Sequence, residues 1–281
     1  MSSSTSNLAV LICHGSYHTP APYAPLVAAL QARGIEAYCP QLPTSDLTKL
    51  NVGDDITNPD FDREPPAGGY PQGEEDAEVV LGVLNPLIHD QGKKVLVLAH
   101  SSGGWVATEA ARPELQTRSR EAKGLAGGIV GIMYMGAFVI PVGESVHSFF
   151  QPKDGPVVAP PFMRFHKYGG AGLGTMVDAG KFLFNGIDPA TAEKWEAGLT
   201  ASPVLTTKLT NDAYSALPCA YLVLEGDLML PKAYQEGMAA LQGQKTGEFT
   251  MYRCPAGHSP HLSWTEGVVD TVLDFVQKVT T

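Results

Sequence analysis

The sequence predicts an α/β fold in which a mostly parallel sheet of about six strands carries helices on both faces. Short apolar runs alternate along the chain with segments whose apolar residues recur at helical spacing. The runs are apolar throughout, which is typical of parallel strands that are covered on both sides. With 281 residues and 44% hydrophobic composition, the chain is long enough to form one large core.

The first half of the chain contains three of the apolar runs. We expect strands over 8–13, 35–40 and 94–99, and helices over 23–34, over 73–90 and from 103 onward. The stretch 43–72 is rich in Pro, Gly and Asp, so we predict a long loop there. Pro86 should kink the second helix, because its ring removes a backbone donor.

The second half resumes the alternation only after a break. Strands are expected within 128–140, 220–226 and 248–254, and valines at helical spacing predict a closing helix. Residues 141–216 break the pattern with many Pro, Gly and aromatic residues. We therefore predict a core domain made of 1–140 and 217–281, with 141–216 inserted as a lid or cap over one edge of the sheet.

Composition and charge exclude several classes of protein. The net charge of −10 and the lack of a basic cluster argue against nucleic acid or membrane partners. No apolar run reaches the ~18 residues needed to span a bilayer, and no signal peptide is evident, so we expect a cytoplasmic protein. The four cysteines form no Cys-x-x-Cys pair and are expected to be buried reduced thiols. The glycine run 169–174 lacks the dinucleotide-binding spacing, and no cofactor is predicted.

Two adjacent serines follow the strand at 94–99, and local packing distinguishes them. A strand–nucleophile–helix elbow is so tight that the residues two before and two after the nucleophile must be small. Ala99 and Gly103 satisfy this for Ser101, whereas Ser102 would place His100 in the first of these positions. Ser101 is therefore the candidate nucleophile. A plain serine helix cap is the alternative interpretation.

An acid and a base are expected after later strands, in the order Ser, acid, His. Asp227 lies in the turn after the strand at 220–226, while Glu225 is expected to lie still on that strand, so Asp227 is favoured over a purely solvated turn residue. His258 lies in the loop after the last strand, while His261 begins a helical stretch. We predict His258 as the base and a structural or pocket-wall role for His261.

The turn after the first strand reads His14-Gly15-Ser16. We predict an oxyanion hole formed by the backbone amides of Ser16 and Ser102, with the Ser16 hydroxyl as a further donor. His14 and His18 have the i,i+4 spacing of metal ligands, but they lie in a turn without a third ligand, so no metal is predicted.

Segments along nearly the whole chain resemble the α/β-hydrolase superfamily, and more closely the small branch of plant methylesterases, hydroxynitrile lyases and related microbial and fungal hydrolases. The likeness lies in LICHGSYHTPAPYAPLVAALQARG, VLAHSSGGWVATEAA, FLFNGIDPATAEKW, YLVLEGDLMLP and AGHSPHLSWTEGVVD. It implies a Ser101–His258–Asp227 triad, in agreement with the choice made at each strand end. One lyase branch carries Thr at the position of Gly15 and Lys at that of Ser259, so hydroxynitrile lyase activity is not expected here.

The sequence thus predicts a serine hydrolase for an ester, lactone or thioester of a mostly apolar small molecule. The alternatives are C–C cleavage, lyase, cyclase or acyl-transfer chemistry on the same fold, and a non-catalytic small-molecule sensor. A flexible lid also permits a homodimer. Side chains that could line the pocket, although core or lid packing explains each equally well, are Tyr17, His18, Trp105, Phe138, Phe149, Phe162 and His166.

Overall fold

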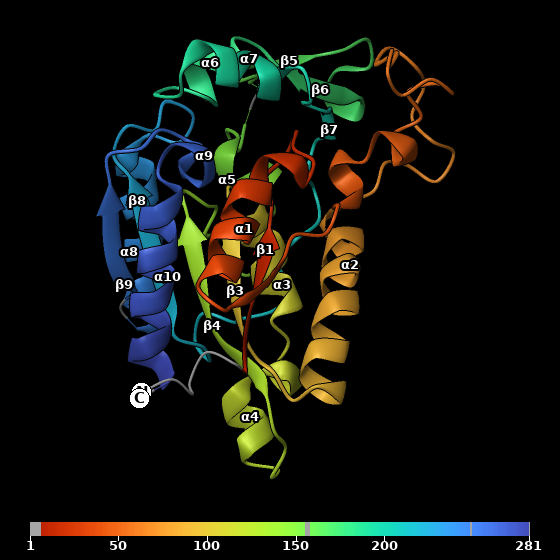
Figure 1. The fold of residues 1–281 in the computed structure, drawn as a ribbon. Coiled ribbons are helices and arrows are strands. Elements are labelled where there is room, and N and C mark those ends of the chain that lie inside the picture. Colours follow the sequence, from red (N-terminus) through yellow and green to blue (C-terminus); the bar gives the residue numbers. More distant parts are fainter. Residues whose placement is uncertain (1–6, 155–157, 248, 281) are drawn as a thin grey trace.

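The main sheet contains six strands in the order β2-β1-β3-β4-β8-β9 (Figure 1). The computed structural model describes residues 7–154, 158–247 and 249–280. Every neighbouring pair of strands in this sheet is parallel. The strands are β1 (Leu8–Cys13), β2 (Glu36–Tyr38), β3 (Lys94–His100), β4 (Gly128–Met135), β8 (Cys219–Leu224) and β9 (Thr250–Cys254). The predicted fold class is confirmed, and each expected strand is present.

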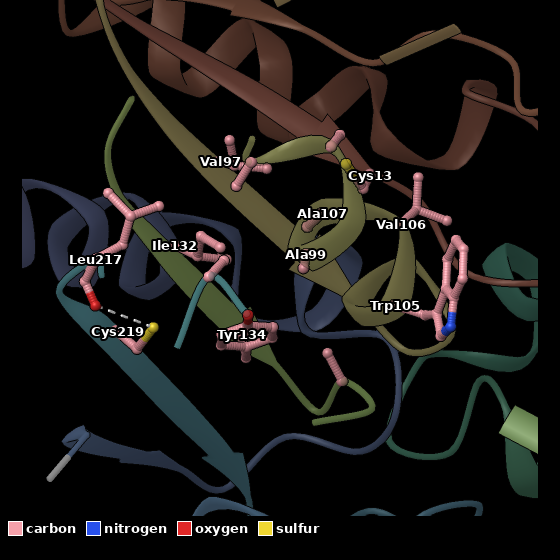
Figure 2. Packing of buried hydrophobic residues seen from close by; sticks show 14 of the residues in the cluster. Cys13, Val97, Ala99, Trp105, Val106, Ala107, Ile132, Tyr134, Leu217 and Cys219 are labelled. Atoms are coloured by element: carbon pink, nitrogen blue, oxygen red, sulfur yellow. Dashed lines mark hydrogen bonds between the residues drawn. The ribbon is translucent and has the colours of Figure 1, made fainter. Parts of the chain in front are cut away.

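Helices cover both faces of this sheet. The long ones are α1 (Ala24–Ala32), α2 (Gly73–Asn85), α3 (Gly103–Ala110), α8 (Lys232–Thr246) and α10 (Thr265–Thr280). Successive residues of β1 point to opposite faces: Val10 and Ile12 pack among residues of α1 and α10, while Leu11 and Cys13 pack among residues of α2 and α3. Figure 2 shows the second cluster, with Ala107 of α3 lying over Ala99 and Cys13. Burial on both faces is the reason why β1 and β8 are apolar throughout, whereas the edge strands β2 and β9 carry exposed residues.

Short helical segments join these elements. They are η1 (Ala21–Tyr23), η2 (Pro43–Ser45), η3 (Leu47–Lys49), η4 (Pro86–Asp90), η5 (Pro113–Leu115), α4 (Thr117–Glu121) and α9 (Pro260–Ser263). Helix α2 ends at Asn85, and the chain continues from Pro86 as a π-helical turn, so the expected kink is a change of helix type. The stretch 43–72 contains the turns η2 and η3 and otherwise runs as a loop.

The described elements of residues 141–216 are α5 (Val146–Phe150), β5 (Met163–Phe165), η6 (Gly169–Ala171), β6 (Leu173–Met176), α6 (Ala179–Phe182), α7 (Pro189–Glu196) and β7 (Ser202–Pro203). The strands, α6 and α7 form a layer beyond one end of the main sheet (Figure 1), whereas Leu209, Ala213 and Tyr214 pack in the core on one face of that sheet. The three strands pair as a small antiparallel sheet in the order β5-β6-β7. Residues 155–157 of this segment lie outside the described residues. That the layer works as a lid stays a prediction.

All four cysteines are free, as expected; Cys13, Cys219 and Cys254 are buried, and Cys39 is half-buried. Across the described ranges, none of the helices combines the length and the apolar character that crossing a membrane requires.

One buried carboxyl outside the strand ends makes stability depend on pH. Asp76, in the first turn of α2, accepts hydrogen bonds from the Thr44 amide at 3.0 Å and the Thr44 hydroxyl at 2.7 Å. Burial nevertheless raises the pKa of Asp76 to about 7. An unfolded Asp has a pKa of about 3.9. As pH rises, the unfolded chain therefore releases this proton first, and stability is lost between about pH 4 and about pH 7.

We expect Asp76→Asn to remove this loss, since an amide of the same shape can keep both partners and does not ionise. The free energy of unfolding of the variant relative to wild type should rise by a few kcal/mol between about pH 4 and about pH 7 and stay level above that. Urea unfolding across this range measures the difference. Glu74→Gln, an exposed acid of the same turn, is the control. A difference for Asp76→Asn that is the same at every pH would contradict the expectation.

Candidate active site

The elbow that carries Ser101 leaves no room for a side chain at the two glycines that follow Ser102. Ser101 follows β3 directly and has a φ of +52°, a conformation that non-glycine residues rarely adopt. A Cβ atom built on Gly103 would lie 2.2 Å from the carbonyl oxygen of Cys13, and one on Gly104 would lie 2.2 Å from that of Phe138. The start of α3 thus packs directly against the ends of neighbouring strands. This close contact requires a residue without a side chain at position 103, as the elbow pattern predicts.

Gly103→Ala is expected to disturb the elbow, because backbone atoms must move to admit the methyl group. We expect a loss of about 1–3 kcal/mol in the free energy of unfolding. The matched control is Gly82→Ala on the exposed side of α2, where no neighbour lies within 4 Å. That change should add about 0.5–1 kcal/mol by favouring the helix. Chemical unfolding of both variants measures the contrast, and equal effects would contradict it.

The candidate acid, Asp227, lies in the turn after β8 and is buried. Its Oδ1 accepts hydrogen bonds from the amides of Met229 and Leu230, both at 2.8 Å. The rival acid, Glu225, lies just past the end of β8 rather than on it and faces Arg253 and Lys232 at the surface. The conformation of this turn therefore directs the Asp227 side chain into the protein and the Glu225 side chain toward the solvent.

The candidate base, His258, lies in the loop after β9 and meets this carboxylate. Its Nδ1–H donates to Asp227 Oδ2 at 2.6 Å, and both side chains are buried. Among the described residues, its Nε2 has no hydrogen-bond partner. His261 instead lies in α9, where its ring stacks on Tyr23 with centroids 4.2 Å apart. The structure thus pairs His258, and not His261, with the candidate acid.

The two predicted oxyanion donors come from segments that contact each other. The Ser16 amide donates to Ser102 Oγ at 2.8 Å, and the two hydroxyl oxygens are also 2.8 Å apart. Ser102 lies at the N-terminal end of α3. For the Ser16 amide to hold an oxyanion as predicted, the Ser102 hydroxyl would have to turn away from it.

A cavity of about 480 Å³ lies between the strand ends and the segment 141–216, and Ser16, Ser101 and His258 line it. Four of the expected wall residues are in place: Tyr17, His18, Phe138 and Phe162.

A model of the alpha/beta hydrolase family matches residues 10–271 of the chain. The chain belongs to the α/β-hydrolase family. The alpha/beta hydrolase nvfD of Aspergillus novofumigatus is 28% identical over 266 residues, which cover 93% of each chain. A pyrethroid hydrolase of Sphingobium wenxiniae is 23% identical over 279 residues, 95% of this chain and 86% of the relative. Among solved structures, an Arabidopsis methylesterase has a TM-score of 0.62 at 15% identity, covering 96% of this chain and 99% of its own.

Three residues expected at the pocket of this α/β hydrolase lie elsewhere. Trp105 packs on α2, where its ring leaves no room for a Cβ at Gly73. Phe149 packs edge-to-face on Phe150. His166 lies at the edge of the small sheet, where it contacts Phe61. Each is an aromatic or imidazole ring whose direction depends on the rotation of its helix or strand about its axis, which the sequence alone did not define.

Two further residues that hold the site of this α/β hydrolase together, Gln235 and Asn185, have no signature in the sequence. The Gln235 side chain, from α8, bonds the backbone of Leu224 through both its oxygen and its nitrogen, and so supports the turn that carries the acid. Asn185, from the segment 141–216, donates to the Gly226 carbonyl at 2.8 Å and accepts from the His258 amide at 3.4 Å. Both are ordinary polar residues in sequence, and no spacing rule marks them.

The two histidines considered as metal ligands, His14 and His18, form hydrogen bonds with backbone groups instead. His14 Nδ1–H donates to the Gly15 carbonyl at 2.9 Å, and its Nε2 accepts from the Leu42 amide at 3.0 Å. Burial lowers the pKa of His14 to about 4 and that of His18 to about 3, so both rings are neutral. Within the described ranges, no group of three or more His, Cys, Asp or Glu side chains could hold a metal ion.

Proposed function

We propose that this α/β hydrolase cleaves a carboxylic ester, lactone or thioester of a neutral, mostly apolar small molecule through Ser101, His258 and Asp227. The observation that carries the proposal is the hydrogen bond of 2.6 Å between His258 and Asp227 at the wall of the cavity that Ser101 also lines. A serine hydroxyl needs an adjacent base to become a useful nucleophile, and a base needs a group that orients it. The three side chains supply these roles.

The reaction follows from the roles of these groups. Ser101 Oγ attacks the carbonyl carbon while His258 Nε2 takes its proton, and the Nδ1–H bond to Asp227 stabilises the imidazolium that forms. The Ser16 and Ser102 amides hold the oxyanion, and a single such donor is worth roughly 2.7–4 kcal/mol of the barrier. His258 then returns the proton to the leaving group. Water releases the acyl group in a second cycle with His258 again as base.

The wall of the cavity indicates the class of substrate. Its described lining is mainly Phe, Pro, Val, Leu and Met, and it includes no Lys, Arg, Asp or Glu. Burying an ionised group against such a wall without a counter-charge is unfavourable. A relative named as a pyrethroid hydrolase and a structural neighbour named as a methylesterase also support ester cleavage. We therefore expect a neutral ester with at least one bulky apolar part.

A series of nitrophenyl esters of increasing acyl length tests this preference. Each added methylene that enters the cavity should raise kcat/KM by up to about fourfold, the equivalent of about 0.8 kcal/mol. Growth should stop when the chain fills the cavity. The matched control is an ester of the same length that ends in a carboxylate, which we expect to be a poor substrate. A preference for the charged ester would contradict the proposed class.

Turnover in ¹⁸O-labelled water separates hydrolysis from the other reactions that the fold can perform. One labelled oxygen in the acid product is expected, because water resolves the acyl-enzyme. An unlabelled product would favour lyase, cyclase or acyl-transfer chemistry. Tight binding without turnover would instead indicate a sensor.

A further inference from the structure

A buried chain of hydrogen bonds joins three of the segments that form the site. The Gly15 amide donates to the Tyr23 hydroxyl at 3.1 Å, and that hydroxyl lies 2.6 Å from His100 Nδ1. His100 Nε2 in turn lies 2.7 Å from the carbonyl oxygen of His258. The chain therefore runs from the turn after β1, through the residue before the nucleophile, to the backbone of the candidate base.

The His258 carbonyl oxygen at the end of this chain of hydrogen bonds determines which atom donates and which accepts in every bond of the chain. A carbonyl oxygen can only accept, so His100 Nε2 carries the hydrogen and donates to His258. In a neutral ring Nδ1 then has a lone pair, so the Tyr23 hydroxyl donates to it and accepts from the Gly15 amide. Every donor and acceptor of Tyr23 and His100 in the chain is thus used, and both side chains are fully buried.

Burial and neighbouring rings keep His100 neutral and Tyr23 protonated, as this pattern of hydrogen bonds requires. Burial lowers the pKa of His100 well below its ordinary value, and the neighbouring rings of His258, His261 and His18 lower it further. Burial likewise raises the pKa of Tyr23 well above its ordinary range. The His100 ring centroid lies only 4.9 Å from that of His258. A neutral His100 can support the imidazolium that forms on His258, whereas a charged one would oppose it.

Packing fixes the orientation of both ends of the chain. The Tyr23 ring stacks on His261 with an interplanar angle of 9°, which holds the phenol in plane. Gly15 lies directly against the nucleophile, since a Cβ built there would lie 2.9 Å from Ser101 Cβ. A small movement of either end would change the distances between Ser101, the oxyanion donors and the base. Errors of about 1 Å in such distances can cost a reaction about 100-fold.

We propose that His100 and Tyr23 are positioning residues for the reaction, acting through the backbone of His258 and Gly15 rather than through the substrate. The proposal rests on the proposed function, because it assigns a purpose to residues around that triad. It also gives His100 a role that its place beside the nucleophile does not suggest, since its ring points away to the base loop and takes no proton.

Two variants at position 100 test the link to His258. His100→Gln keeps an N–H at about the reach of Nε2 and can still donate to the His258 carbonyl, while His100→Ala cannot. We expect kcat to fall about 10- to 100-fold in the alanine variant, with KM changed little and partial recovery of kcat in the glutamine variant. A residue that served only stability would lower the apparent kcat through the amount of folded enzyme alone, so kcat per titrated active site would stay at the wild-type value. Active-site titration with a fluorophosphonate corrects for the folded fraction.

Tyr23→Phe tests the other link while keeping the stacked ring. Its matched control is Tyr134→Phe, which removes a buried phenol oxygen of β4 that bonds Thr108 at 2.7 Å, away from the cavity lining. Both changes should lower stability, but only Tyr23→Phe should slow turnover and fluorophosphonate labelling, by about tenfold.

The outcomes distinguish the two proposals. Wild-type kcat in both His100 variants, or equal kcat in the two Tyr→Phe variants, would overturn the positioning role and leave the proposed function untouched. Labelling or turnover that persists in Ser101→Ala would overturn the proposed function itself. If His100→Ala does not fold, His100→Gln and Tyr23→Phe still decide the question.

Discussion

Ser101→Ala is expected to abolish turnover of activated esters and covalent labelling by a fluorophosphonate. In the proposed mechanism this hydroxyl is the side-chain group that forms the acyl-enzyme bond, so its removal eliminates the acyl-enzyme. The expected loss in kcat is on the order of 10⁶-fold, with only the oxyanion hole and binding left to assist water. Stopped assays with a nitrophenyl ester and intact-mass measurement of the labelled protein check both effects.

The neighbouring serine provides the matched control for this experiment. Ser102→Ala removes a hydroxyl of the same kind but keeps the backbone amide that is proposed to hold the oxyanion. Labelling at Ser101 should therefore persist in this variant. In the structure the Ser102 hydroxyl accepts a hydrogen bond from the Ser16 amide. The turnover of Ser102→Ala therefore also reports how far that hydrogen bond affects the oxyanion hole. Labelling that survives in Ser101→Ala and disappears in Ser102→Ala would reverse the assignment.

The positions of the strands along the chain could be predicted from the sequence because most of these strands are buried on both faces. The runs at 8–13 and 94–99 are apolar at every position except Lys94, and in the structure β1 and β3 pair in the interior of the sheet. The order of all six strands was not predicted, since it depends on how the crossover helices return the chain. Pro86 predicts a kink because the missing backbone donor is a local property of proline, and the helix type changes at that residue.

The site could be outlined from sequence only where local rules apply. A parallel sheet brings the ends of β1, β3, β8 and β9 to one edge, so residues just after these strands meet there. The cavity wall is different, because residues such as Phe150 and Met163 reach it only through the fold of segment 141–216. Contacts such as that of Asn185 with Gly226 join parts of the chain with no sequence relation. The linkage of Tyr23 to His100 likewise became visible only in three dimensions.

Asp227→Asn is expected to lower kcat by about 10⁴-fold while KM changes little, because the loss concerns the state of His258 and not the fit of the substrate. In the structure Oδ1 of Asp227 already accepts from the amides of Met229 and Leu230, so an asparagine oxygen should keep that place. Its NH₂ group would then face His258 Nδ1. That nitrogen would have to accept rather than donate, which puts the proton on Nε2 and prevents the ring from taking the proton of Ser101.

Glu225→Gln is the control, since this acid lies two residues earlier, pairs with Arg253 at the surface and should affect kcat less than about twofold. The rate of fluorophosphonate labelling is the most direct readout, because it depends on the nucleophile and the base but not on a particular ester. Labelling should slow with kcat in Asp227→Asn. If Glu225→Gln were the slower variant, the acid would have to be reassigned. If neither variant slowed, His258 would be acting without a carboxylate partner. The bond of 2.6 Å between His258 and Asp227 would then be structural rather than catalytic.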